Sequence, residues 1–240
     1  MQRISTLLIG VSAALVLLLA GANTTRADLY FEYDQITKGV PNQSDGRGII
    51  KQYLTADATA TDLGDAVTII DMQAKMLYEL DRGTRTYRKT EVEKLGVIPG
   101  MGPEGKEMAE NPMFQAMLRS MMDSLKVTPT EEYKTIAGYK CRKYIVKVMM
   151  STSEYWVTKE IDGYDEMKAI GEKASQLFMN NPMMKQLNIA SMMNTLDGFP
   201  VHTVTEMMGG TITTTLTRME RKKLDPALFT VPADYKRIAD

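Results

Sequence analysis

The length, composition and charge of the chain limit what it can do. It has 240 residues, of which 29 are Lys or Arg and 30 are Asp or Glu, giving a formal net charge of −1 at pH 7. This balance argues against a nucleic-acid-binding protein and against a polybasic protein of the membrane surface, because both need an excess of positive charge. The single Cys excludes an internal disulfide, so the fold must be stabilised by packing.

The first 27 residues differ from the rest of the chain. Arg3 precedes an apolar run, and small residues follow at Ala20, Ala22 and Ala27, which is the pattern of a secretory signal peptide. The run is shorter than the roughly 18 to 20 residues that span a bilayer. We therefore expect export, cleavage after Ala22 or Ala27, and no transmembrane segment after cleavage. We expect the remaining residues, 28–240, to form a single domain.

Alternating residues predict a β-meander in the first part of this domain. In the segment DLYFEYDQIT, residues 28–37, Leu29, Phe31 and Tyr33 occupy every second position, which is the period of a β-strand. Further strands are predicted at 66–71, 75–80 and 84–92. The Asp81–Gly83 stretch between the last two is a turn signal, so neighbouring strands should be antiparallel.

The strand pattern returns later in the chain, where β-branched residues are frequent. The predicted strands are 138–150, 153–161, 199–207 and 211–224. Together with weaker segments, about eight to eleven strands are expected, at the spacing typical of an open or closed barrel. The predicted fold class is mainly β with α-helical insertions (α+β).

The first helical insertion is predicted at about 104–126. Asn111 is a good N-cap, and Pro112 suits the first helical position, where its missing N–H is not needed. Two adjacent rows of apolar residues at i, i+4 spacing then form one broad face. The rows are Met113, Met117 and Met121, and Phe114, Leu118 and Met122.

The second insertion is predicted at about 164–196. It begins with an amphipathic piece that carries Met167, Ile170, Ala174 and Leu177. Pro182 disfavours helical geometry at Asn181, so the helix is expected to break there and to restart with Asn181 as a new cap. The apolar residues of the restarted piece are Met183, Leu187, Ile189, Met192, Met193 and Leu196.

Three interpretations of these methionine-rich helices stay open. The helices cover a sheet and the methionines are ordinary core, as apolar residues at helical spacing usually are. Alternatively they form a lid over an apolar cavity, because the flexible, polarizable Met side chain can repack around acyl chains of varying shape. A third interpretation is a Cu(I) site, since thioethers favour soft metals. The sequence lacks exposed Met-x-Met clusters with histidine, so we expect no metal and no cofactor.

An enzyme is not indicated by any motif. His202 is the only histidine, and its strand setting, FPVHTVTEM, offers no nucleophile or carboxylate at a recognisable spacing. A nucleophile elbow, a phosphate loop and a zinc-ligand spacing are all missing from the sequence. We therefore expect a non-enzymatic protein, with Trp156 as a core or cavity-wall aromatic.

Several segments resemble a known group of proteins. TIIDMQAKMLYELDRGTRTYRK is similar to the repeated hairpins of the periplasmic lipoprotein carriers (LolA/LolB-like). The segments IAGYKCRKYIV, EYWVTKEI, GFPVHTVTEM and KKLDPALFTVPADYKRI resemble an uncharacterised family of exported bacterial proteins related to those carriers. The resemblance implies an unclosed, strongly curved antiparallel β-barrel with helices packed on its concave side around an apolar cavity. It also implies the periplasm of a Gram-negative cell envelope.

The carriers use a strand arginine to hold their lid closed, and this chain offers several candidates without a clear equivalent. They are Arg47, Arg82, Arg85, Arg88 and Arg142. The functional hypothesis is a periplasmic protein that binds a hydrophobic partner, namely an acyl chain, a lipid or a lipid-modified protein, beneath the methionine-rich helices and Trp156. The alternatives are an envelope structural or interaction module whose cavity is permanently filled, and a Cu(I)-binding protein.

Overall fold

The structure, a computed structural model, describes residues 28–41, 43–94, 111–149, 151–179 and 195–238. These residues form one sheet of twelve strands. The strands before the first insertion are β1 (Leu29–Lys38), β2 (Gly46–Leu54), β3 (Ala58–Asp62), β4 (Ala66–Asp71), β5 (Met76–Asp81) and β6 (Thr86–Glu91). The later strands are β7 (Lys126–Ile136), β8 (Tyr139–Val148), β9 (Ser151–Thr158), β10 (Phe199–Met207), β11 (Gly210–Arg221) and β12 (Lys236–Arg237).

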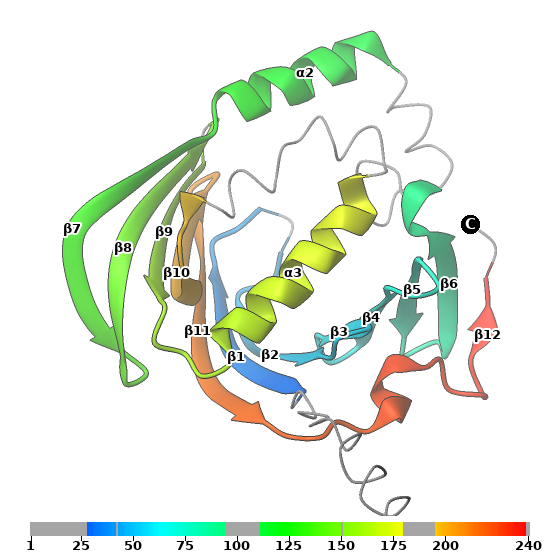
Figure 1. The fold of residues 1–240 in the computed structure, drawn as a ribbon. Helices are drawn as coiled ribbons and strands as arrows, with labels where there is room; N and C mark the ends of the chain where they lie inside the picture. Colours follow the sequence, from blue (N-terminus) through cyan, green and yellow to red (C-terminus); the bar gives the residue numbers. More distant parts are fainter. Residues whose placement is uncertain (1–27, 42, 95–110, 150, 180–194, 239–240) are drawn as a thin grey trace, which may run out of the picture.

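The strands form one strongly curved layer (Figure 1). Their order is β12-β6-β5-β4-β3-β2-β1-β11-β10-β9-β8-β7. All neighbours are antiparallel except β12 and β6, which are parallel. The two end strands, β12 and β7, do not pair with each other, so the barrel is unclosed. The predicted mainly β, unclosed and curved antiparallel sheet is therefore confirmed.

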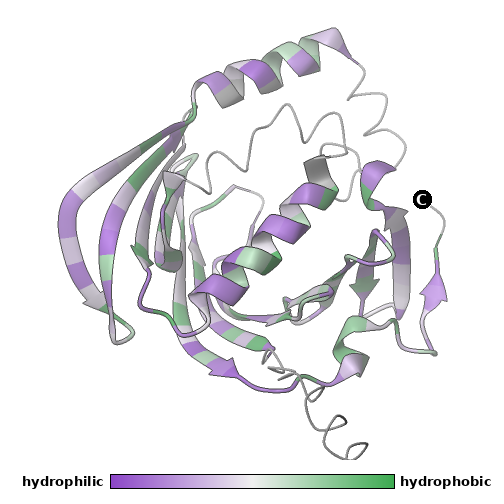
Figure 2. Cartoon of the chain, in the orientation of Figure 1, coloured by the Kyte–Doolittle hydropathy of each residue, from purple (hydrophilic) through white to green (hydrophobic). Residues whose placement is uncertain are grey.

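The eight strands predicted from alternation are all present, and four others were not predicted individually. β2 begins with the sequence GRG, and β7 contains the charged run EEYK, so neither shows a clear two-residue period. β3 is only five residues long, and β12 only two. Hydrophobic and hydrophilic residues alternate visibly along the longer strands (Figure 2), as expected for a sheet with two different environments.

The main core lies on the inner face of the central strands. Leu29, Phe31, Val201 and Leu216 are almost completely buried there. Cys141, from β8, belongs to the same cluster, and burial raises the pKa of its thiol. Cys141 is thus a small buried residue with a suppressed thiolate form, as expected of a structural cysteine.

The C-terminal segment covers β3–β5 on the face opposite the helix α3 (Figure 1). It contains the short 3₁₀ helix η2 (Pro226–Phe229), capped by Asp225, whose side chain accepts a hydrogen bond from the amide of Ala227. Phe229, Val231 and Tyr235 pack against a second buried cluster, formed by Ala60, Val67, Ile69 and Leu80. The curved sheet is therefore packed on both faces in its N-terminal half.

Besides η2, the described helices are α2 (Pro112–Asp123), α3 (Tyr164–Met179) and the 3₁₀ turn η1 (Val92–Lys94). Asn111 caps α2 as predicted: its Oδ1 atom accepts a hydrogen bond from the Met113 amide at 2.9 Å. α3 lies inside the curve of the sheet, whereas α2 runs across the top of the view (Figure 1). Within the described residues, no helix has the length and hydrophobicity to cross a membrane. The predicted helix restart at Asn181 lies outside the described residues.

Candidate functional site

A cavity of about 850 Å³ lies between α3 and the concave face of the sheet. Six strands that are consecutive in the sheet, β3-β2-β1-β11-β10-β9, contribute to its walls. The helix contributes residues from Tyr164 to Gln176, and Asp197 and Gly198 come from the segment before β10. The cavity therefore spans the place where the N-terminal and C-terminal strands meet, at the β1–β11 pair.

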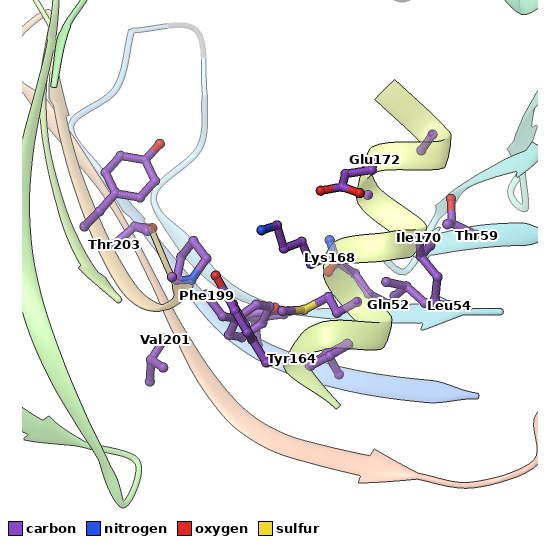
Figure 3. A pocket seen from close by; sticks show the side chains of 18 of the residues that line it. Gln52, Leu54, Thr59, Tyr164, Lys168, Ile170, Glu172, Phe199, Val201 and Thr203 are labelled. Carbon is purple, nitrogen blue, oxygen red and sulfur yellow. The ribbon is translucent and has the colours of Figure 1, made fainter. Parts of the chain in front are cut away.

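The base of the cavity is apolar and aromatic. The ring centroids of Phe31 and Phe199 are 5.1 Å apart, and Tyr33 lies 6.4 Å from each of them. These distances are typical of favourable aromatic packing. Leu54 from β2 and Ile170 from α3 extend the apolar wall (Figure 3). The alternation of β1 explains the arrangement, because residues 29, 31 and 33 must all face the same side of the sheet.

Polar groups interrupt this apolar surface. Tyr33 and Tyr155 line the cavity, and burial raises the pKa of both hydroxyls, so they remain protonated at neutral pH. Within the described part of the chain, neither hydroxyl has a protein hydrogen-bond partner, and the same holds for the side chain of Gln52 from β2. These groups are therefore available to water or to a ligand.

Charged side chains enter the cavity from α3. Lys168 and Glu172 both line it, and both also remain exposed to solvent. Figure 3 shows both extending from the helix toward the strand that carries Thr203. Asp197 also contributes to the wall, but its carboxylate pairs with Lys159 at 2.7 Å. Among the described residues, no group of three or more His, Cys, Asp and Glu side chains is placed to hold a metal ion.

His202 contributes to the cavity wall, and its Nδ1 is 2.8 Å from the hydroxyl of Thr215 on the neighbouring strand. Burial, and then the charge of Lys134, lower the pKa of the imidazole, so His202 is neutral at pH 7. Its hydrogen-bonded position on a strand agrees with a structural histidine. The cavity thus combines an apolar base with hydroxyl, amide and charged groups, which is the surface that an amphipathic molecule requires.

Of the methionine-rich residues predicted from the sequence, the structure describes the side chains of three. Met113 and Met117 on α2 are 81% and 48% exposed, and Phe114 on the same helix is half-buried. None of these three lines the cavity. Leu118, Met121 and Met122 belong to α2, but their side chains lie outside the described part. Met183, Leu187, Met192 and Met193 are likewise outside the described residues, so their contact with a ligand stays a prediction.

Trp156 is not a lining residue of this cavity. It follows Tyr155 on β9 and is partly buried against the main core cluster, so the expectation of a core aromatic is confirmed. The Lys143 and Lys134 ammonium groups lie 5.7 and 6.0 Å from the centroid of its rings. None of the five arginines suggested by the resemblance lines the cavity either.

The residues that do form the site were partly visible in the sequence. The i, i+3, i+7 row of Met167, Ile170 and Ala174 marks the inner face of α3, and all three line the cavity. The alternation of Phe31 and Tyr33 marks the facing wall. Lys168 and Glu172, in contrast, carry no sequence signal, because charged residues on a helix normally face solvent.

Several solved structures are similar to this chain at low identity. One of PNGF-II is 14% identical over 88% of this chain and 31% of that chain, with a TM-score of 0.40, so this chain spans about a third of it. A DUF1329 family protein from Desulfovibrio piger ATCC 29098 is 10% identical over 86% and 91% of the two chains, with a TM-score of 0.35. A putative outer membrane lipoprotein-sorting protein domain from Vibrio parahaemolyticus is 8% identical over 85% and 89%, with a TM-score of 0.30.

At these identities and TM-scores, none of the similarities supports an inference about activity, ligand or partner. No curated protein matches the chain significantly. One family does match: residues 107–235, more than half of the chain, fit the family described as a domain of unknown function, DUF4412. This match confirms the expectation of an uncharacterised family. It includes α2, α3 and all the later strands that contribute to the cavity, and the chain therefore belongs to the DUF4412 family.

Proposed function

We propose that this protein binds an amphipathic ligand and holds its acyl chain in the cavity between α3 and the concave face of the sheet. The observation that carries the proposal is the cavity itself, whose volume of about 850 Å³ lies within the range of small-molecule sites, roughly 300 to 1,000 Å³. Its aromatic base suits a hydrocarbon chain. Its unpaired hydroxyl, amide and charged groups suit a polar head.

Binding would be driven by removing the acyl chain from water. Each methylene group that becomes buried contributes about 0.8 kcal/mol, so even a partly buried chain supplies several kcal/mol before the losses of freedom on association are subtracted. Phe31, Phe199 and Ile170 provide the apolar contacts. The protein would act as a binding protein or carrier without chemical conversion of its ligand, in the periplasm to which the first 27 residues are expected to direct it.

The methionine-rich segments are proposed to cover the ligand. Met113 and Met117 expose apolar surface on α2, and exposed apolar surface of this kind is a common feature of binding sites. In this proposal α2 moves toward the bound acyl chain, and the flexible methionine side chains adapt to its shape. This movement of α2 is separable from binding of the ligand in the cavity, so each can be tested by its own variant.

The test is the binding of a fluorescent fatty acid to the purified protein. Ile170→Glu places a charge in the apolar wall and should weaken binding by at least about tenfold, because an unpaired charge there costs more than 1.4 kcal/mol. Met117→Asp changes α2 but not the cavity. If binding needs the cavity alone, the Met117→Asp variant should bind the fatty acid normally. If α2 closes over the ligand, this variant should bind the fatty acid more weakly.

Circular dichroism of the sheet should be unchanged in both variants. Normal binding by Ile170→Glu would refute the cavity as the binding site. Absence of binding by the unmodified protein would refute the proposed function as a whole.

A further inference from the structure

The charges on α3 form two classes that differ in their partners. Glu166 pairs with Arg221 of β11 at 2.6 Å, and Lys173 pairs with Asp57 at 2.7 Å and also donates to the carbonyl of Ala56. These charges connect the helix to the sheet at two places. Lys168 and Glu172, the pair that lines the cavity, form no ion pair with any residue that the structure describes.

Lys168 and Glu172 also do not neutralise each other. They are four residues apart, so their Cβ atoms lie about 5–6 Å apart on one side of the helix. The order in which Lys precedes Glu is the less favourable one for an i, i+4 ion pair, and no such pair forms. Instead both side chains extend away from the helix into the cavity (Figure 3). The result is a positive and a negative group side by side, one helical turn apart.

No other charge in the cavity wall is free to contribute, among the described residues. Asp197 is paired with Lys159, and His202 is neutral and hydrogen-bonded to Thr215. Lys168 and Glu172 therefore form the polar end of the cavity. Their charges sum to zero, but they create a strong local dipole. A purely anionic head would be attracted by Lys168 and repelled by Glu172, and a purely cationic head would meet the reverse.

We propose that the cavity selects an acyl-chain ligand with a zwitterionic head group of the phosphoethanolamine type, its phosphate on Lys168 and its ammonium on Glu172. This inference rests on the proposed function, because it assigns the polar end of the same cavity. A head with both charges compensates both side chains. Charge-assisted hydrogen bonds of this kind are stronger than neutral ones, and they gain further when the apolar chain excludes water beside them.

Three probes that share one acyl chain test the inference: lysophosphatidylethanolamine, the free fatty acid and the monoacylglycerol. The unmodified protein should bind the zwitterionic probe about three- to tenfold more tightly than the other two, corresponding to two partly exposed charge contacts. Glu172→Gln should remove this preference and strengthen binding of the fatty acid. Lys168→Gln should weaken binding of both the fatty acid and the zwitterion.

The charge-exchanged double variant Lys168→Glu, Glu172→Lys provides a further measurement, because it keeps both charges and should recover part of the preference for the zwitterion. Lys223→Gln and Asp165→Asn are matched controls, since both residues are exposed and outside the cavity, and they should leave all three affinities unchanged. Equal affinity of the unmodified protein for the three probes would overturn the head-group inference and leave the acyl-chain cavity intact. Failure of all three probes to bind would instead overturn the proposed function.

Discussion

The two α-helices of the described residues, α2 and α3, share an amphipathic sequence pattern but differ in how they are held. α3 packs Tyr164 and Met167 against the main core, and ion pairs from Glu166 and Lys173 fix it to the sheet. α2 exposes Met113 and Met117. At its C-terminal end, the Ser124 hydroxyl accepts a hydrogen bond from the Met149 amide at 2.9 Å.

This difference teaches that helical periodicity identifies an apolar face but not the surface that covers it. α3 enters the concave side because Gly163, at φ +76°, turns the chain against Leu29 at the start of the helix. α2 has the predicted cap, but Met113 and Met117 on its apolar face are exposed. We therefore expect α3 to be integral to the fold and α2 to be separable from it.

The largest effect is expected where α3 meets the core. Leu29 is fully buried below the start of α3, so Leu29→Ala should lower the free energy of unfolding by about 3 kcal/mol. Met113→Ala on α2 should change it by less than about 0.5 kcal/mol, because the side chain is exposed. Urea denaturation measures both. A comparable loss in the two variants would show that α2 is as tightly packed as α3.

The connection into α3 should be the next most sensitive point. A Cβ atom at Gly163 would lie 2.9 Å from the Leu29 side chain, at a positive φ. Gly163→Ala should therefore cost about 2 kcal/mol from backbone strain and overpacking. Gly171, within α3, has open space around its Cβ position, so Gly171→Ala should instead stabilise the protein by about 0.5–1 kcal/mol. Thermal unfolding of the two variants should shift in opposite directions, and a shift in the same direction would contradict this account.

The sequence was sufficient for the strands with a clear two-residue period, because alternation follows directly from the geometry of a strand. It also predicted the cap of α2 from Asn111 and Pro112. It was insufficient for β2 and β7, whose glycines and charges mask the period, although both strands pair with strands that are their neighbours in sequence. It was also insufficient for the pairing of β1 with β11, which positions the cavity and joins strands far apart in sequence.

The sequence predicted the type of site, an apolar cavity, better than it predicted the residues that line it. An apolar cavity with helices at its concave side followed from the resemblance, and the inner row of α3 followed from its spacing. Methionine content directed attention to α2, whose Met113 and Met117 do not line the cavity. Lys168 and Glu172 could not have been selected, because both are exposed and only the docking of α3 places them beside the cavity.

A local effect is expected when the cap of α2 is removed. Asn111→Ala removes the side-chain acceptor for the Met113 amide, at a cost of about 1 kcal/mol to the helix. If α2 unfolds independently, amide hydrogen exchange along it should become about fivefold faster, while global stability changes little. Asp225→Ala removes the corresponding cap of η2, which packs on the sheet, and should lower global stability by about 1 kcal/mol. Equal global losses in both variants would mean that α2 unfolds only with the whole protein.

The smallest effect concerns the ion pair that fixes the middle of α3. Hydrogen bonds from Lys173, and then from Gln73, hold the pKa of Asp57 below its ordinary value of 3.8. A lowered folded-state pKa stabilises the protein above pH 3.8, and this contribution is lost as the pH falls through the folded-state pKa. Because the Lys173 and Asp57 side chains are 44% and 54% exposed, the contribution should not exceed about 0.5 kcal/mol.

A double-mutant cycle with Asp57→Asn and Lys173→Gln isolates this coupling, measured by urea denaturation at pH 6 and again at pH 3. The coupling should be present at pH 6 and reduced at pH 3. Asp123→Asn on α2 is the matched control, since its carboxylate forms no ion pair with a described residue. A coupling that persists unchanged at pH 3 would show that Lys173 holds α3 through the carbonyl of Ala56, whose hydrogen bond does not titrate. In that case α3 would still be held where α2 is not, but by the backbone of the β2–β3 turn instead of by charge.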